Sequence, residues 1–89
     1  MDSEERIQAA ELLRQQLEEH GVEALDMLTP REKKVIFLRL GLADGRIRTR
    51  EEAGGELGLS PEHVRLIETK VLRRFYMIAR RRRLRDFLS

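Results

Sequence analysis

Two short helices separated by a tight turn are predicted within residues 49–75, and this pattern constrains the fold more than any other feature of the sequence. Thr49 and Glu52 have the spacing of a capping box, which begins a helix that a glycine ends before the turn. Ser60 is a favourable cap for the next helix, with Pro61 at its first position. Two helices joined by a short, glycine-containing turn are typical of a helix-turn-helix, whose second helix enters the major groove of DNA.

The rest of the chain also shows the apolar spacing of helices, and Thr29 and Glu32 form another capping box. Val64, Ile67 and Val71 lie on one stripe of the last helix, which is therefore expected to be long. We predict an all-α fold, a small helical bundle that contains the helix-turn-helix. Its helices are expected near residues 4–19, 22–28, 30–40, 50–57 and 61–80, followed by a short C-terminal turn or helix with Leu84, Phe87 and Leu88.

Two consecutive glycines, Gly54 and Gly55, lie inside the predicted helix 50–57. Each costs about 1 kcal/mol relative to alanine in a helix interior. A close approach of the crossing helix would explain one of them, and the residue pattern gives no reason for the other.

The composition excludes several classes of protein. The 89 residues suit one domain with a modest core, and the absence of cysteine excludes disulfides and thiolate metal sites. No apolar run is long enough to span a membrane and no signal peptide is recognised, so we expect a soluble, cytoplasmic chain. His20 and His63 have no evident nucleophile or metal partner. We therefore expect no enzyme, and no metal, cofactor or small-molecule substrate.

The charge is distributed unevenly along the chain. Residues 1–28 hold eight acidic and two basic side chains, a net charge of −6, whereas residues 29–89 hold sixteen basic and eight acidic ones, a net charge of +8. We therefore divide the chain into an acidic helical segment, 1–28, and a basic helix-turn-helix domain, 29–89. Such asymmetry indicates a nucleic-acid surface on the basic part, the alternative being charged residues that only solvate helix faces.

The outer face of the second helix of the motif has the residue types of a DNA-reading surface. Glu62 can accept a hydrogen bond from a cytosine amino group, whereas Leu66 can contact only an apolar group such as the thymine methyl. The alternative is a solvated helix face with one exposed leucine. The residues able to meet phosphates or acidic partners are Arg65, Lys70, Arg73 and Arg74.

An ordered series of short motifs then resembles a known family. The first motifs are Leu28-Thr29-Pro30-Arg31-Glu32, Val35-Ile36 and Leu38-Arg39-Leu40-Gly41-Leu42. The series continues with Asp44-Gly45, Thr49, Glu51-Glu52, Gly54, Leu57-Gly58, Val64-Arg65, Ile67-Glu68, Lys70, Leu72-Arg73 and Leu84-Arg85-Asp86-Phe87-Leu88. From about residue 20 to residue 89, the chain resembles region four of bacterial sigma factors, the promoter-recognition subunits of RNA polymerase.

The resemblance implies partners and site residues. Region four reads the −35 promoter element through the second helix of its motif and docks on the flap of the polymerase β subunit, in the cytoplasm at the bacterial nucleoid. The positions matching the family's phosphate contacts are Arg31, Arg39, Ser60, Arg65 and Lys70. Those matching its base contacts are Pro61, Glu62 and Leu66. Arg65, Lys70 and Arg73 match a face touched by activators, and an anti-sigma protein is a further expected partner. For the flap surface we nominate Leu40, Leu42, Leu72 and Phe75, which also suit an ordinary core.

The departures from the family pattern are concentrated where the DNA sequence is read. The primary members of the family usually have two base readers, Arg and Gln, at the positions of Pro61 and Leu66, and a backbone-contacting Arg at the position of His63. Arg50 stands where Leu is usual, and Glu62 alone keeps a base-reading side chain. The resemblance therefore implies a promoter-binding domain with altered base specificity. The alternative is a polymerase-binding interaction module, a co-sigma or regulator, that does not read DNA sequence.

Overall fold

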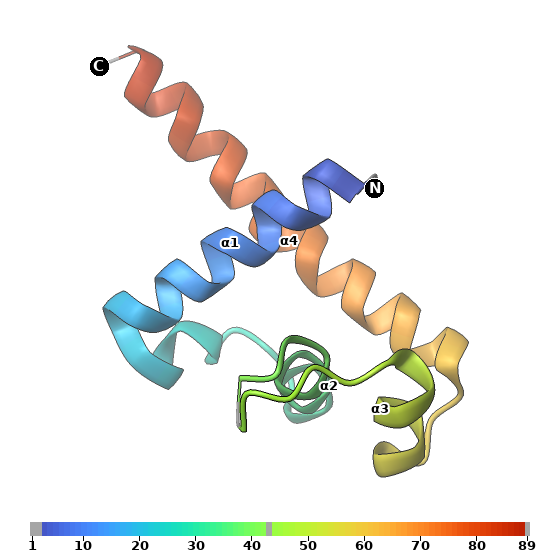
Figure 1. The fold of residues 1–89 in the computed structure, drawn as a ribbon. Helices are drawn as coiled ribbons and strands as arrows, with labels where there is room; N and C mark the ends of the chain where they lie inside the picture. The colour runs from blue at the N-terminus through green and yellow to red at the C-terminus, as the bar shows by residue number, and fades with distance from the viewer. Residues whose placement is uncertain (1–2, 43, 89) are drawn as a thin grey trace. The chain divides into compact units, whose positions relative to one another are not determined.

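The computed structural model describes residues 3–42 and 44–88, and these residues form helices and connecting turns without a strand (Figure 1). The elements are α1 (Ser3–His20), the 3-10 helix η1 (Gly21–Leu25), α2 (Pro30–Leu40), α3 (Arg50–Leu57) and α4 (Pro61–Leu88). The prediction of an all-α fold with a helix-turn-helix is confirmed, with α3 and α4 as the two helices of the motif.

The described chain divides into two compact units. The central unit is Met27–Thr69, and the terminal unit combines Met1–Asp26 with Lys70–Ser89, as far as these segments are described. The buried apolar side chains of the terminal unit come from α1, from the end of η1 and from α4; they are Ala9, Leu12, Leu13, Leu25, Val71, Leu72 and Phe75. The division of the chain at residue 28 into an acidic segment and a basic domain remains a prediction.

The core of the central unit joins α2, α3 and the first turns of α4. Val35, Ala53 and Val64, one from each helix, are fully buried together. The partly buried apolar residues packed against them are Leu38, Leu57, Leu59 and Ile67. This small core packs α3 and the first turns of α4 against α2. It therefore holds the exposed face of α4 in this unit in a defined position.

The predicted capping boxes begin α2 and α3. The Thr29 hydroxyl accepts from the amide of Glu32 at 3.2 Å, and the Glu32 carboxylate accepts from the amide of Thr29 at 2.9 Å. Thr49 and Glu52 form the same pair of bonds, both at 3.1 Å. Each box satisfies two amides that a helix start leaves without an intrahelical partner. The predicted starts at residues 30 and 50 are thus confirmed.

Two predicted segments differ from the structure. Residues 22–28 were expected to form a helix, but the chain makes a 3-10 helix that ends at Leu25. The expected break after residue 80 is wrong, because α4 continues to Leu88. No glycine or proline occurs between residues 62 and 88, and arginine and leucine favour helix, so nothing in the sequence stops α4. The side chains of Leu84, Phe87 and Leu88 lie outside the described part.

Candidate nucleic-acid interface

The turn between α3 and α4 depends on Gly54. Its carbonyl accepts hydrogen bonds from the amide of Gly58, which has φ +70°, and from the amide of Leu59 at 2.9 Å. A Cβ atom at position 54 would lie 2.4 Å from the carbonyl oxygen of Leu59, whereas one at Gly55 would meet no atom within 4 Å. The close approach expected from the sequence therefore exists at Gly54, but the turn makes it rather than the crossing helix.

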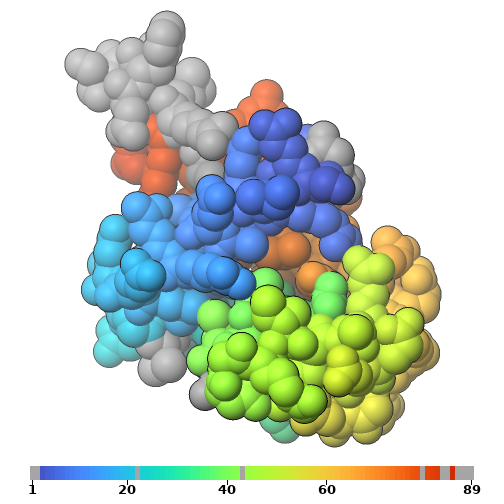
Figure 2. All heavy atoms as spheres, in the orientation of Figure 1, coloured from blue at the N-terminus to red at the C-terminus, as the bar shows by residue number. Residues whose placement is uncertain are grey.

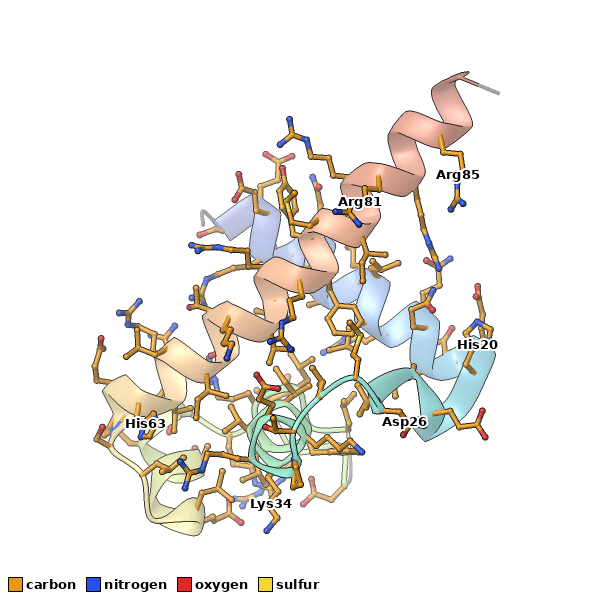
Figure 3. All side chains as sticks on the ribbon, turned by 180° about the vertical axis from the view of Figure 1, so that it is seen from behind. His20, Asp26, Lys34, His63, Arg81 and Arg85 are labelled. Carbon is orange, nitrogen blue, oxygen red and sulfur yellow. The ribbon has the colours of Figure 1, made fainter. Side chains whose placement is uncertain are left out.

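The first turns of α4 have one buried and one exposed face. The helix begins at Pro61, and the Ser60 hydroxyl accepts from the amide of His63 at 3.1 Å, which confirms the predicted cap. Val64 anchors the buried face in the central core. Figure 3 labels His63 near the start of the helix. The exposed side chains are those of Pro61, Glu62, His63 and Leu66, with Leu66 53% exposed.

An exposed ion pair joins two residues of this face. Arg65 Nη2 lies 2.6 Å from Glu62 Oε1, and Arg65 Nε lies 2.9 Å from Glu62 Oε2. The hydrogen bonds from Arg65 lower the pKa of the Glu62 carboxyl, with smaller contributions from the charges of Arg65 and Arg50. The same pair raises the pKa of Arg65. The carboxylate is therefore ionised at neutral pH, so both of its oxygens can accept hydrogen bonds.

A buried carboxylate, Glu68, ties the three helices of the central unit together. Its oxygens accept from Arg39 of α2, with Nε at 2.9 Å and Nη2 at 3.4 Å, and the side chain of Glu68 is 6% exposed. Arg50 at the start of α3 places its Nε 3.7 Å from the same carboxylate. Arg39 Nη1 also donates to the backbone carbonyl of Arg48 at 2.6 Å. The nominated phosphate contact Arg39 thus has structural partners.

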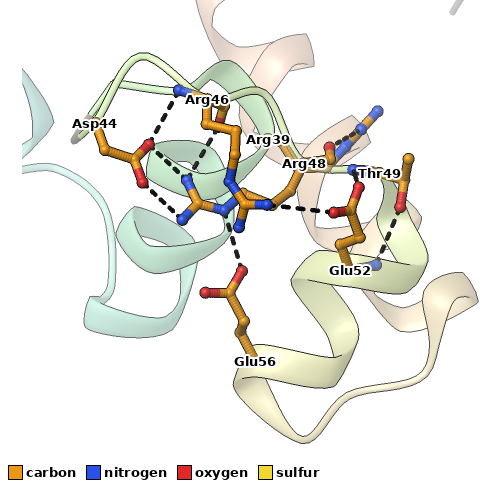
Figure 4. Close-up of polar contacts among 7 residues, drawn as sticks. All are labelled: Arg39, Asp44, Arg46, Arg48, Thr49, Glu52 and Glu56. Atoms are coloured by element: carbon orange, nitrogen blue, oxygen red, sulfur yellow. Dashed lines mark hydrogen bonds and ion pairs between the residues drawn. The ribbon is translucent and has the colours of Figure 1, made fainter.

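The loop between α2 and α3 is held by a buried arginine, Arg48 (Figure 4). Its terminal nitrogens lie 2.6 and 2.7 Å from the two carboxylate oxygens of Asp44, and its Nε lies 3.1 Å from Glu56 of α3. The hydrogen bonds from Arg48 lower the pKa of Asp44 to about 2, so this contact persists at neutral pH. Figure 2 shows the loop and α3 on the face of the central unit turned to the viewer. The ion pairs fix how the chain enters the helix-turn-helix.

The other nominated residues are distributed over both units. Arg31, in the first turn of α2, is exposed, as are Lys70 and Arg73 in the terminal unit. Of the residues nominated for the flap, Leu40 and Leu42 are partly buried in the central unit. The other two, Leu72 and Phe75, are each 2% exposed and belong to the buried set of the terminal unit.

Neither Arg48 nor Glu68 was predicted to be a buried ion. For Glu68 a signal was present, because it lies four residues after Val64 and three before Val71, on the buried face of α4. A carboxylate at such a position requires a cationic partner, since an unpaired buried charge is strongly unfavourable. For Arg48 no comparable signal exists, because it lies in an irregular loop.

Two classes of feature are absent from residues 3–42 and 44–88. Within these ranges no cluster of three or more histidine, aspartate and glutamate side chains could hold a metal ion. Over the same part of the chain, no helix combines the length and the apolar character needed to cross a bilayer.

Comparison with known proteins identifies the family. Residues 24–76, which include α2, α3, the turn and α4 as far as Tyr76, match the family model described as sigma-70, region 4. Over 81 residues, 91% of this chain, the sequence is 50% identical to the RNA polymerase sigma factor SigA of a Bacillus species, and 49% identical to SigA of Listeria monocytogenes serovar 1/2a. These stretches are 20% and 21% of the two relatives, so the chain spans about one fifth of their length. Because the family match covers more than half of the chain, the chain belongs to the sigma-70 region 4 family.

Proposed function

We propose that this chain is the promoter-recognition region of a sigma factor and binds double-stranded promoter DNA at the −35 element. The observation that carries the proposal is the start of α4, which is capped, packed on α2 and α3, and exposes four side chains in the position of a recognition helix. The similarity to two SigA proteins supports it. The site of action is then the cytoplasm, at the nucleoid.

We further propose that the base specificity differs from that of the housekeeping family members. Pro61 has no donor or acceptor in its side chain, and Leu66 offers only apolar contact. Each lost bidentate contact removes about 1–3 kcal/mol of discrimination against a wrong base. Glu62 remains as an acceptor, and its oxygens already accept hydrogen bonds from Arg65. Phosphate contacts then supply most of the affinity.

Restoring the usual base readers should restore preference for the −35 element. In the double variant Pro61→Arg, Leu66→Gln, we expect the ratio of affinities for a −35 duplex and a scrambled duplex to rise at least about tenfold, or about 1.4 kcal/mol. The new Arg and Gln side chains can each make two hydrogen bonds to one base, whereas Pro61 and Leu66 make no polar contact with a base. Competition binding at one fixed salt concentration measures the ratio.

A matched control separates base reading from added charge. The variant Pro61→Lys, Leu66→Ala adds the same charge without the guanidinium fork or the amide of the restored variant, so it should strengthen binding to both duplexes and raise their ratio less than the restored variant does. If the wild-type chain already discriminates as strongly as the restored variant, the proposal of altered specificity is wrong.

We propose that the polymerase β flap is the protein partner, bound through an apolar surface that includes Leu40 and Leu42. Both are partly exposed, as a docking residue must be. Pull-down with a purified β-flap fragment should show binding at tens of micromolar or tighter, and Leu42→Asp should abolish it, because a charge would have to lose its hydration in an apolar contact. Circular dichroism establishes that the variant is folded.

The exposed leucine of the recognition face provides the control for flap binding. Leu66→Asp introduces the same charge at a position outside the nominated surface and should leave capture by the flap fragment unchanged. Equal losses in the two variants, or no capture of the wild-type chain, would remove the flap from the proposal.

A second candidate function is a polymerase-bound interaction module that does not read DNA sequence. The observation that favours it is Leu66, 53% exposed in the middle of the recognition face, where an apolar side chain suits a protein partner. This candidate replaces promoter recognition if neither the wild type nor the restored variant binds DNA more tightly than a neutral control protein does, while flap capture persists.

A further inference from the structure

The cluster around Glu68 contains more positive than negative charge. Two guanidinium groups, Arg39 and Arg50, lie beside one carboxylate. Arg39 forms hydrogen bonds with both carboxylate oxygens, at 2.9 and 3.4 Å, whereas Arg50 Nε lies 3.7 Å from Glu68 Oε2, beyond a hydrogen bond. Arg50 is therefore attracted to Glu68 but is not neutralised by it, and the three groups together carry one excess positive charge.

Arg50 is also incompletely satisfied as a donor. Among the described side chains, its Nε is a buried nitrogen without a hydrogen-bond partner. Its side chain as a whole is 34% exposed, so the terminal amino groups remain accessible to a ligand. A guanidinium presents five donors and is suited to phosphate oxygens. The buried carboxylate holds the side chain at its inner end and leaves the outer end available.

The charge of Arg50 acts on the recognition face. It contributes to the lowered pKa of Glu62, which lies in the first turn of α4, and both residues belong to the central unit. In a helix-turn-helix complex the second helix lies in the major groove, while the first helix crosses the phosphate backbone. Arg50 is the first residue of that first helix, α3. Its excess charge therefore lies where a bound duplex presents phosphates.

We propose that Arg50 contacts a DNA phosphate, which supplies the second anion that the Arg39–Glu68–Arg50 cluster lacks. This inference rests on the proposed DNA-binding function and adds a residue outside the recognition helix. The contact is independent of sequence, because a phosphate is present at every nucleotide. The cation of Arg50 compensates for the arginine of the family pattern that Pro61 has replaced. The affinity for DNA is thereby retained, while base reading is reduced.

The salt dependence of DNA binding tests the role of Arg50. Each cation that neutralises a phosphate contributes about −0.9 to the slope of log affinity against log salt, so a contact from Arg50 steepens the slope by that amount. In Arg50→Leu the slope should become shallower by about 0.9, and the affinity for a promoter duplex should fall about tenfold. Leucine is usual at this position in the family, so the variant is expected to fold.

Two further variants distinguish a phosphate contact from a structural role. Arg50→Lys keeps the charge and should keep the wild-type slope. Arg14→Leu removes the same charge from an exposed position of α1 and should leave the slope unchanged. A wild-type slope in Arg50→Leu, or an equal change in Arg14→Leu, overturns the inference while the proposed function stands. Absence of DNA binding by the wild-type chain overturns both.

Discussion

Replacing Glu68 with alanine should lower the free energy of unfolding by about 3–5 kcal/mol. Among the described residues, Glu68 is the only carboxylate that pairs with Arg39, whose side chain is 19% exposed. The change therefore leaves a largely buried guanidinium that has lost its counter-charge. For a domain of this size, the melting temperature should fall by more than about 10 °C. Urea unfolding followed by circular dichroism, together with thermal melting, measures both quantities.

Two variants provide the comparison for Glu68. Glu11→Ala removes an exposed carboxylate of α1 and should change stability by no more than about 0.5 kcal/mol. Glu68→Gln keeps the shape of the side chain and one acceptor oxygen. Its free energy of unfolding should therefore lie between those of Glu68→Ala and Glu11→Ala. If Glu68→Ala is as stable as Glu11→Ala, the buried ion cluster does not stabilise the central unit.

Alanine at two adjacent positions of α3 should have opposite effects on stability. Gly54→Ala should lower the free energy of unfolding by about 2–3 kcal/mol, because its Cβ would lie 2.4 Å from the backbone oxygen of Leu59 and the turn would have to move. Gly55→Ala should raise it by about 0.5–1 kcal/mol, because position 55 has open space and alanine is the better helix former. Chemical denaturation of both variants checks the prediction.

The two glycine variants serve as controls for each other, since they make the same chemical change one residue apart. Equal stabilisation by both would show that helix propensity, and not the approach of Leu59, governs this segment. The Gly54→Ala variant should also bind promoter DNA more weakly if it folds, because a displaced turn reorients the start of α4.

Helix starts were predictable from the sequence because they depend on residues only three positions apart. Thr29 and Glu32, Thr49 and Glu52, and Ser60 with the amide of His63 form the predicted local hydrogen bonds. The apolar stripe through Val64 and Val71 likewise identified buried positions of α4. These signals do not require knowledge of how the helices pack.

The end of the last helix was predicted less well, because no residue marks it. The helix was predicted to end near residue 80, but the arginines that follow are good helix formers and no glycine or proline comes after them. The segment 22–28 was wrongly predicted to be a separate helix. Gly21, with φ +63°, ends α1, and the few residues after it close only a 3-10 turn.

The buried ion pairs were beyond sequence reasoning because their partners are distant in the chain. Arg39 and Glu68 are 29 positions apart, and although the spacing of Glu68 places it on the buried face of α4, nothing in the sequence identifies Arg39 as its partner. Only the packing of α2 against α3 and α4 makes their pairing necessary. The role of Arg50 follows from the same cluster, so it too appears only once the three helices are assembled.

The ion pair between Glu62 and Arg65 has a consequence for how such a helix reads DNA. A lone carboxylate entering the groove is repelled by the phosphates on both sides, whereas a carboxylate that enters with its own guanidinium forms a neutral dipole. Each oxygen of the pair keeps a second lone pair for a base amino group. Discrimination between bases at Glu62 should then depend little on ionic strength, even though total affinity depends on it steeply. Such a domain would keep its choice of promoter while the salt content of the cell changes how tightly it holds the site.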